Sequence, residues 1–245
     1  MLLLAAAVVV LIVVKWGQRE LDFQRTQSLL HDASLALHAP DGDAAVLASL
    51  SRAQRLLTTF VQPSVVHVDG IRKRPNGLDA HSTGSGWIWD DEGHIVTAWH
   101  VVRHLDDIDI ELHNGSIRRA EFVAGDSLTD IAVLKIDPTH PIPATRAQHN
   151  SVQQGDIVFA FGSPLDFRFS VTSGVVSGIG REIGPAIWPG GPRYENSIQL
   201  DAPINPGSSG GPVTNHLGKV VGMSTAIAAD PRDRGPERFS GVAMA

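Results

Sequence analysis

From residue 61 to its end, the sequence consists of short runs of strand-forming residues separated by turn signals. Such runs cover 65–68, 86–89, 94–97, 108–112, 117–123, 131–136, 157–161, 171–179, 198–200, 220–225 and 239–243. Pairs such as Asn114-Gly115 favour the tight turns that join antiparallel strands. About a dozen short strands with no helical segment between them predict an all-β fold of two antiparallel six-stranded barrels rather than βαβ units, divided near residue 148.

The first 16 residues have a different character. Leu2 to Val14 form an unbroken apolar run, which is short for a membrane-spanning helix and closer to the hydrophobic region of a signal sequence. No basic residue precedes the run and no clean small-x-small cleavage site follows it. We interpret residues 1–16 as a signal or membrane anchor, either a short one or the end of a longer one, with the remainder outside the cytoplasm. A buried core helix is the alternative.

Residues 17–60 carry two helical patterns. Apolar residues recur at helical spacing from Leu21 to Leu37 and again from Val46 to Phe60, and Pro40-Asp41-Gly42 separates the two stretches. We expect a helical spacer that connects the anchor to a domain spanning residues 61–245.

The composition excludes several classes of function. The chain holds 20 Lys and Arg against 26 Asp and Glu, a formal net charge of −6, and it has no basic stripe of the kind that binds nucleic acids. It contains no cysteine, which rules out disulfides, thiolate nucleophiles and cysteine-ligated zinc. Apolar residues make up 42% of the chain, so a sizeable core is available and the composition is not that of a disordered protein.

The segment from Asn205 to Pro212 (Asn-Pro-Gly-Ser-Ser-Gly-Gly-Pro) is rich in glycine and serine and follows a strand-like run. Glycine lets the backbone adopt positive φ or approach a ligand closely. A serine in this setting can hold its Oγ outward while nearby N–H groups converge on one point, the geometry that stabilises an oxyanion. Ser209 is therefore a candidate nucleophile. A Gly/Ser surface turn is the alternative unless the chain also supplies a base and an orienting group.

His100 and Asp130 are the candidates for that base and that orienting group. His100 ends a strand-like run, and Asp130 precedes the apolar strand 131–136. Alone, Asp130 has the character of a turn residue that opens a strand, but a serine nucleophile needs a base whose tautomer a carboxylate fixes. His104 lies four residues after His100, yet the zinc-protease motif needs Glu where Val101 stands. We therefore expect no metal and no cofactor.

The glycine-rich segment also matches the G-x-S-x-G turn of α/β-hydrolases. That fold requires the order Ser, acid, His on a parallel sheet. The only histidine after Ser209 is His216, and no Asp or Glu lies between them. The order His100, Asp130, Ser209 is instead that of chymotrypsin-like proteases.

The chain from about Pro63 to Ala245 resembles the protease domain of the HtrA/Deg family of trypsin-like serine proteases. The segments that carry the resemblance are 84–86 (Gly-Ser-Gly), 97–102 (Thr-Ala-Trp-His-Val-Val), 129–135, 161–164 (Phe-Gly-Ser-Pro), 171–174 (Val-Thr-Ser-Gly), 205–212 and 222–226 (Gly-Met-Ser-Thr-Ala). The resemblance implies a chymotrypsin-like double β-barrel and an ATP-independent endopeptidase. It further implies action on unfolded or damaged proteins in the periplasm or cell exterior, usually as a homotrimer.

Carried over residue by residue, the resemblance makes Ser209 the nucleophile, His100 the general base and Asp130 its buried orienting group. The oxyanion hole would comprise Gly207, Ser208 and Ser209, with the N–H groups of Gly207 and Ser209 as donors. The chain departs from the family pattern at two places. Ser208 stands where the family usually has Asn, and Trp99 stands where a small or amide residue is commoner.

The resemblance also predicts where substrate binds. Ile204, Ile227 and Ala228 match apolar positions that wall the primary pocket, so we expect cleavage after small aliphatic residues unless nearby Asp201 intervenes. The substrate main chain would pair with the segment Gly222, Met223, Ser224 and Thr225 by strand addition. The charged stretch 230–238 lies where the family has a regulatory loop, although an ordinary solvated loop is the favoured interpretation.

Two further functions stay open from the sequence. Residues 1–245 end in what resembles the last barrel strand and include no PDZ domain. One alternative is therefore a binding or holdase module whose triad is held in an inactive geometry. The other is a signalling protease that cuts one dedicated membrane substrate.

Overall fold

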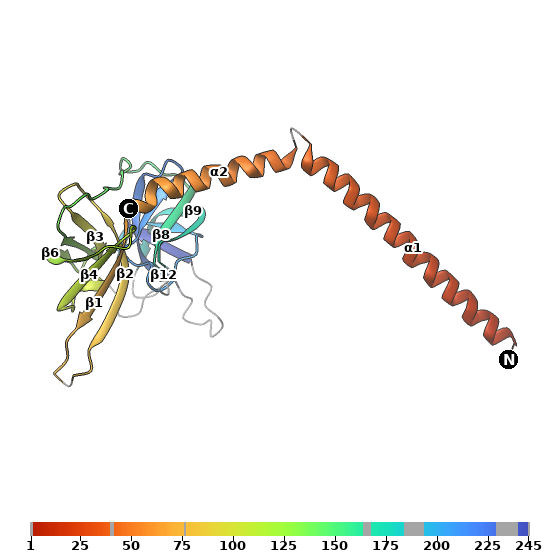
Figure 1. The fold of residues 1–245 in the computed structure, drawn as a ribbon, viewed down its shortest axis with the longest axis horizontal. Helices are drawn as coiled ribbons and strands as arrows, with labels where there is room; N and C mark the ends of the chain where they lie inside the picture. The colour runs from red at the N-terminus through yellow and green to blue at the C-terminus, as the bar shows by residue number, and fades with distance from the viewer. Residues whose placement is uncertain are drawn as a thin grey trace. The chain divides into compact units, whose positions relative to one another are not determined.

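The structure is a computed structural model that describes residues 2–39, 42–75, 77–163, 168–183, 194–228 and 240–244. The chain divides into two compact units, Met1–Arg55 and Leu56–Ala245. The first unit holds α1 (Leu2–His38) and the first turns of α2 (Asp43–Val61). The two helices meet at the break predicted from Pro40-Asp41-Gly42 (Figure 1).

Helix α1 extends from Leu2 through the predicted end of the anchor at residue 16 without interruption. Across the described part of the chain, no helix combines the length and apolar character required to cross a membrane.

The last turns of α2 belong to the second unit. Leu57 and Val61 are buried and form a cluster with Val65, Phe159 and Phe161. This unit therefore begins at Leu56, before the domain start that the sequence pattern suggests at residue 61. A short 3₁₀ turn, Gln62–Ser64, leads directly into the first strand.

The first barrel is one antiparallel sheet in the strand order β5-β4-β1-β2-β3-β7-β6. Its strands are β1 (Val65–Arg72), β2 (Ala80–Ile88), β3 (His94–Ala98), β4 (Asp107–Leu112), β5 (Ile117–Arg119), β6 (Glu121–Asp126) and β7 (Ile131–Lys135). The sequence pattern predicts one strand over 117–123, whereas the structure has two, separated only by Ala120. β5 and β6 are the two edge strands of the sheet, and they are joined in sequence by the single residue Ala120. The Ala120 N–H donates to the Ile108 carbonyl of β4. The chain therefore passes directly from one edge of the sheet to the other at this residue.

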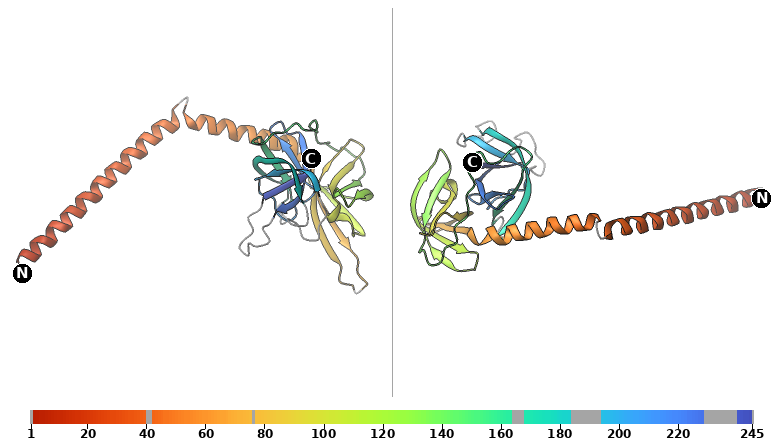
Figure 2. Two further views of the ribbon diagram at one scale, coloured as in Figure 1. Left: turned by 180° about the vertical axis from the view of Figure 1, so that it is seen from behind. Right: turned by 90° about the horizontal axis from the view of Figure 1, so that it is seen from above.

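The second barrel is closed, in the order β10-β13-β12-β11-β8-β9. Its strands are β8 (Ile157–Gly162), β9 (Ser170–Ile183), β10 (Tyr194–Leu200), β11 (Pro212–Asn215), β12 (Val220–Ala228) and β13 (Ser240–Met244). Strand β11 is not predicted from the sequence, because its four residues directly follow the glycine-rich segment. The prediction of an all-β fold with two antiparallel barrels is confirmed (Figure 2).

Each barrel has its own core, as the alternating sequence pattern requires. In β4 every second residue is buried, and these residues join the larger core cluster around Ile95 and Leu134. The second core contains Val158, Leu200 and Val213. A single helical turn, α3 (Trp99–Val102), follows β3, and its position at the end of that strand holds His100.

Candidate active site

His100 and Asp130 come together from two neighbouring strands of the first barrel. Ala98, the last residue of β3, pairs with Ile131, the first residue of β7. This register places His100, two residues after Ala98, next to Asp130, the residue before Ile131. The Nδ1 atom of His100 lies 2.7 Å from Oδ2 of Asp130, and the His100 N–H donates to Oδ1 at 2.8 Å. The predicted pairing of these two side chains is therefore present, with the carboxylate on Nδ1 as a general base requires.

Asp130 is buried and surrounded by donors. The side chain is only 2% exposed, and the Thr225 hydroxyl also donates to Oδ2. Burial on its own raises the pKa of a carboxyl group, but the hydrogen bond and charge of His100, together with the Thr225 hydroxyl and the His100 N–H, hold the pKa of Asp130 below its usual value. Asp130 is thus an anion at neutral pH, fixed against the imidazole.

Ser209 is anchored next to the segment that carries His100. Its carbonyl accepts a hydrogen bond from the Ser85 N–H at 2.8 Å. A Cβ placed on Gly84 would lie 3.1 Å from this carbonyl and 2.7 Å from the side chain of Val101, the residue after His100. On the other side, a Cβ on Gly210 would lie 2.8 Å from the N atom of Ala98. Gly84 thus lies between Val101 of α3 and the Ser209 carbonyl, and Gly210 lets the serine turn pack against Ala98, the residue before α3.

The turn before Ser209 has the form expected of an oxyanion hole. The Ser208 N–H donates to the Asn205 carbonyl at 2.9 Å, Pro206 follows Asn205, and Gly207 has φ of 95°. This is the pattern of a type II turn, which needs glycine at its third position. Within the described residues, the N–H groups of Ser208, Gly210 and Gly211 donate to carbonyls, whereas those of Gly207 and Ser209 have no hydrogen bond to the protein. These two N–H groups are the predicted donors.

Ser85 connects the first barrel to the serine turn, a role that the sequence analysis did not assign. Its hydroxyl donates to the Gly207 carbonyl at 2.6 Å and accepts the Ser163 N–H at 2.8 Å, while its own carbonyl accepts the Thr97 hydroxyl at 2.7 Å. Ser85 is fully buried. A serine between two glycines in a strand, Gly84-Ser85-Gly86, is the one local signal that could have indicated it.

The predicted substrate-binding residues have mixed outcomes. Ile204 is buried and apolar as expected, within the core cluster of the second barrel. Asp201 is exposed, and its Oδ1 accepts the Val175 N–H at 2.6 Å, so its carboxylate is already engaged. The side chains of Ile227 and Ala228 and the stretch 230–238 lie outside the described residues.

Strand addition along Gly222 to Thr225 needs a correction. Gly222 and Met223 pair with β11, and Met223 also pairs with β13. The Ser224 N–H donates to the Gly211 carbonyl, and the Ser224 carbonyl accepts the Gly210 N–H. The Thr225 hydroxyl donates to the Asp130 carboxylate. After Ser224, β12 still pairs with β13 on one side. On its other side the pairing with β11 ends at Met223, because β11 begins at Pro212, directly after the serine turn. Among the described residues, the edge of β12 that pairs with no other strand therefore begins at Thr225.

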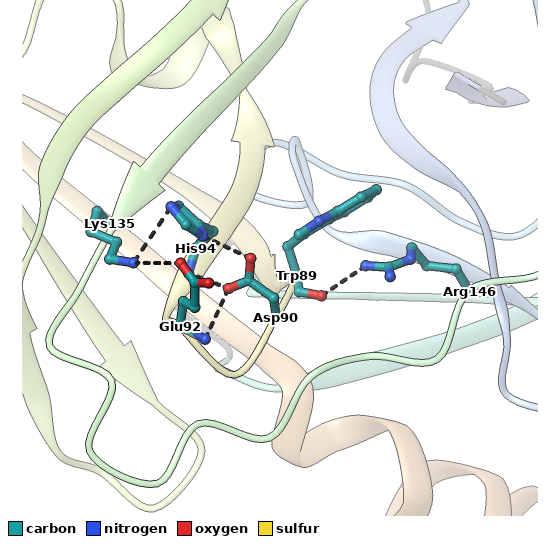
Figure 3. A network of polar contacts seen from close by, with 6 residues as sticks. All are labelled: Trp89, Asp90, Glu92, His94, Lys135 and Arg146. Atoms are coloured by element: carbon teal, nitrogen blue, oxygen red, sulfur yellow. Dashed lines mark hydrogen bonds and ion pairs between the residues drawn. The ribbon is translucent and has the colours of Figure 1, made fainter.

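A second histidine–aspartate pair lies on the same barrel (Figure 3). Nδ1 of His94 is 2.7 Å from Oδ2 of Asp90, and Lys135 Nζ lies 3.4 Å from Nε2 of His94 and 3.8 Å from Glu92. Burial raises the pKa of Asp90, but hydrogen bonds from the His94 N–H and ring, with the Glu92 N–H, lower it below its usual value.

This second pair borders a cavity of about 910 Å³ between the two barrels. Trp89 lies at its rim, where the Arg146 guanidinium stacks 3.9 Å from the ring centroid and donates to the Trp89 carbonyl. Among the described residues, no group of three or more His, Asp or Glu side chains is arranged to hold a metal ion.

A double β-barrel with a His–Asp pair on a buried carboxylate, next to a segment that packs on a glycine-rich serine turn, is characteristic of the class of chymotrypsin-fold peptidases. Comparison with known proteins agrees, because the model of the trypsin-like peptidase domain matches residues 84–223. The chain belongs to this family, and within it to the HtrA/Deg proteases.

The similar proteins include several named serine endoproteases. The chain is 42% identical over 171 residues to serine endoprotease DegS of Escherichia coli, covering 66% of this chain and 46% of that protein. It is 39% identical over 175 residues to chloroplastic Protease Do-like 1 of Arabidopsis thaliana, covering 67% and 39%. The solved structure of HtrA-type protease AlgW with a tripeptide superposes with a TM-score of 0.67 at 31% identity, covering 77% of this chain and 58% of that one. The chain thus spans less than half the length of these two curated relatives.

Proposed function

We propose that this chain is the catalytic domain of a serine endopeptidase that uses Ser209, His100 and Asp130 as its triad. The observation that carries the proposal is the buried carboxylate of Asp130 on Nδ1 of His100, with the Ser209 carbonyl bonded to Ser85 and Gly210 packed against Ala98, the residue before the helical turn that holds His100. A carboxylate on Nδ1 fixes the tautomer in which Nε2 can accept a proton, and it stabilises the imidazolium that then forms.

In the proposed mechanism, Ser209 Oγ attacks the carbonyl carbon of the scissile peptide bond while Nε2 of His100 takes the hydroxyl proton. The N–H groups of Gly207 and Ser209 donate to the oxygen that becomes negative, and loss of one such donor typically costs about 3 kcal/mol. His100 then gives its proton to the leaving amine, and the acyl group stays on Ser209. A water molecule, deprotonated by His100, hydrolyses this ester and restores the serine hydroxyl.

The substrate main chain would add as a strand to the edge of β12 from Thr225 onward. Buried Ile204 supports an apolar primary pocket, and Asp201 is engaged by Val175 instead of pairing a basic side chain. We therefore propose cleavage after small aliphatic residues.

The relatives support the setting of the proposed activity. One of them, 39% identical over 158 residues, is named a probable periplasmic serine endoprotease of Halomonas elongata. We propose by analogy that this protein acts outside the cytoplasm on unfolded polypeptides, as a homotrimer. The apolar run of residues 2–14 supports the further proposal that residues 1–16 anchor it to a membrane.

The test compares the full chain with Ser209→Ala and, as a matched control, Ser208→Ala. We expect the unmodified chain to cleave casein and to react with a fluorophosphonate probe. Ser209→Ala should lose both reactions without a change in melting temperature, whereas Ser208→Ala should keep them. A folded chain that binds unfolded casein but neither cleaves it nor reacts with the probe would instead be the latent holdase. Cleavage of a single membrane-protein peptide but not of casein would indicate the signalling protease.

A further inference from the structure

Trp99 is the residue before His100, and its main chain contacts Asp130, the proposed orienting residue. The helical turn α3 begins at Trp99, and Ala98 before it has no side chain that could cap the turn. The first N–H groups of α3 are satisfied by Asp130 instead. The Trp99 N–H donates to the Asp130 carbonyl at 2.8 Å, and the His100 N–H donates to Oδ1.

Asp130 has a backbone conformation that must be held in place by its surroundings. Its φ is 55°, in the left-handed region that non-glycine residues rarely adopt. Because Asp130 lies in the hairpin that joins β6 to β7, any movement of that hairpin moves the carboxylate. The hairpin itself is supported by Asp126, which accepts the Leu128 N–H and the Thr129 hydroxyl at 2.9 Å each.

The ring of Trp99 covers this hairpin. It packs against Phe122 of β6 with ring centroids 5.7 Å apart. A Cβ placed on Gly125 would lie 2.5 Å from Cε3 of Trp99, so no other residue fits beneath the ring without displacing it. Gly125 does not have positive φ, so the backbone conformation does not call for glycine there. The glycine makes room for the ring.

Gly125 is also the residue through which the ring would act on Asp130. It pairs with Ala132 across the hairpin, and Asp126 pairs with Ile131, so the strand under the ring is bonded to the two residues that follow Asp130. β6 is an edge strand whose residues are all exposed, and it therefore depends on contacts such as this one to stay in place.

We propose that Trp99 is a positioning residue that holds the hairpin 125–132, and with it the Asp130 carboxylate, in line with His100. Its N–H fixes the strained main chain of Asp130, and its ring fixes β6 through Gly125 and Phe122. The inference rests on the proposed function, since it concerns the geometry of the same His–Asp pair.

The test is a double-mutant cycle in the full chain with Trp99→Ala, Gly125→Ala and the double variant, and with Trp99→Phe as the conservative replacement. Trp99→Ala should lower kcat about tenfold for a peptide substrate and leave KM nearly unchanged, since misplacement of a catalytic group by a fraction of an ångström has effects of this size. Gly125→Ala should have a similar effect alone and no further effect in the absence of the Trp99 ring. Trp99→Phe, which keeps an aromatic ring, should retain most of the kcat of the unmodified chain. The control is Trp89→Ala, which removes an exposed tryptophan ring elsewhere and should change neither kcat nor KM.

The hydrogen bond between His100 and Asp130, followed through the NMR signal of the His100 Nδ1 proton, provides a readout that does not depend on turnover. Nδ1 and Oδ2 lie 2.7 Å apart, and a charge-assisted hydrogen bond of this length needs the carboxylate in line with the ring. Trp99→Ala should therefore weaken the bond and shift or broaden the signal. A lower melting temperature with an unchanged Nδ1 proton signal and kcat would overturn the inference in favour of packing alone. A raised KM with unchanged kcat would overturn it in favour of a substrate contact. If the unmodified chain is inactive toward casein and the probe, the proposed function fails, and the NMR signal still decides the role of Trp99.

Discussion

The first barrel contains two histidine–aspartate pairs whose contact distances are the same and whose surroundings differ. In both pairs Nδ1 lies 2.7 Å from a carboxylate oxygen, and both carboxyl groups have a lowered pKa. Asp130, however, is 2% exposed, whereas Asp90 is 30% exposed. The separation in sequence is 30 residues for His100 and Asp130 but four for His94 and Asp90.

The difference shows that the pair by itself does not define a catalytic site. Nε2 of His94 faces the ammonium group of Lys135, a donor that satisfies the acceptor and brings no nucleophile (Figure 3). The Asp90 carboxylate mainly closes a turn, since it also accepts the N–H groups of Glu92 and His94. In the other pair the carboxylate accepts the hydroxyl of Thr225 from the second barrel, and the chain on either side of His100 lies close to Gly84 and Gly210, next to Ser209. Burial of the carboxylate and the segments that surround the pair therefore distinguish the candidate base from the structural contact.

The largest expected effect comes from removing each imidazole in turn. His100→Ala should lower kcat/KM for a peptide substrate by about 10⁴- to 10⁶-fold, the range typical for loss of a triad member. His94→Ala, the matched control, should change it by less than about threefold, because among the described residues the polar contacts of that ring are with Asp90 and Lys135. Equal losses from the two variants would contradict the distinction drawn between the pairs.

A smaller effect is expected from the hydroxyl that encloses Asp130. Thr225→Val keeps the shape of the side chain but leaves the buried Oδ2 with one donor fewer. Loss of a hydrogen bond to a buried charge typically costs about 1.5–3 kcal/mol, so kcat should fall about tenfold or more. Thr139→Val, which removes a hydroxyl from the exposed carboxylate of Asp137, is the control and should leave kcat unchanged. Retention of full activity by Thr225→Val would show that burial and the hydrogen bonds of His100 are sufficient to hold Asp130.

These contacts also mark the limit of what could be predicted from the sequence. The strands and the triad candidates have local signatures, such as alternating burial in β4 and the glycines around Ser209. The contact of Thr225 with Asp130 spans 95 residues, and that of Ser85 with Gly207 spans 122 residues. A single hydroxyl group produces no periodic pattern in the sequence. Its hydrogen-bond partner is therefore determined by the packing of the two barrels and could not be predicted from the sequence.

The pairing of Gly222 and Met223 and the second histidine pair could not be predicted from the sequence for related reasons. The resemblance predicts strand addition along Gly222 to Thr225, but β11, which has no strand signature in the sequence, already pairs with Gly222 and Met223. His94 opens the predicted strand 94–97, and nothing near it in the sequence indicates that its ring contacts Asp90 and Lys135.

The next effect concerns the connection of the first barrel to the serine turn. Ser85→Ala removes the hydroxyl that links the Gly207 carbonyl to the Ser163 N–H. We expect kcat to fall about threefold and stability by about 1–3 kcal/mol, because two buried polar groups lose their partner. The control is Ser116→Ala, whose hydroxyl contacts only Asn114 in a hairpin turn. An unchanged reactivity of Ser85→Ala toward the fluorophosphonate probe, combined with lower stability, would limit Ser85 to a structural role.

The smallest expected effect is on the pH dependence of stability, and it tests the role assigned to the exposed pair. The pKa of Asp90 is lower in the folded protein than in the unfolded chain, where an aspartate titrates at about 3.9. Its ionised form therefore stabilises the fold above that pH, and the contribution is lost as the pH falls below it toward the folded-state pKa. Asp90→Asn should lower the free energy of unfolding by at most about 1 kcal/mol at neutral pH, since the pair is partly exposed. Chemical denaturation between pH 7 and 3 should show the difference from the unmodified chain shrinking toward acid, with peptidase activity at pH 7 unchanged. If the difference in the free energy of unfolding instead grows toward acid, the ionised carboxylate is not the stabilising form of Asp90. Exposure would then be the property that distinguishes the two pairs.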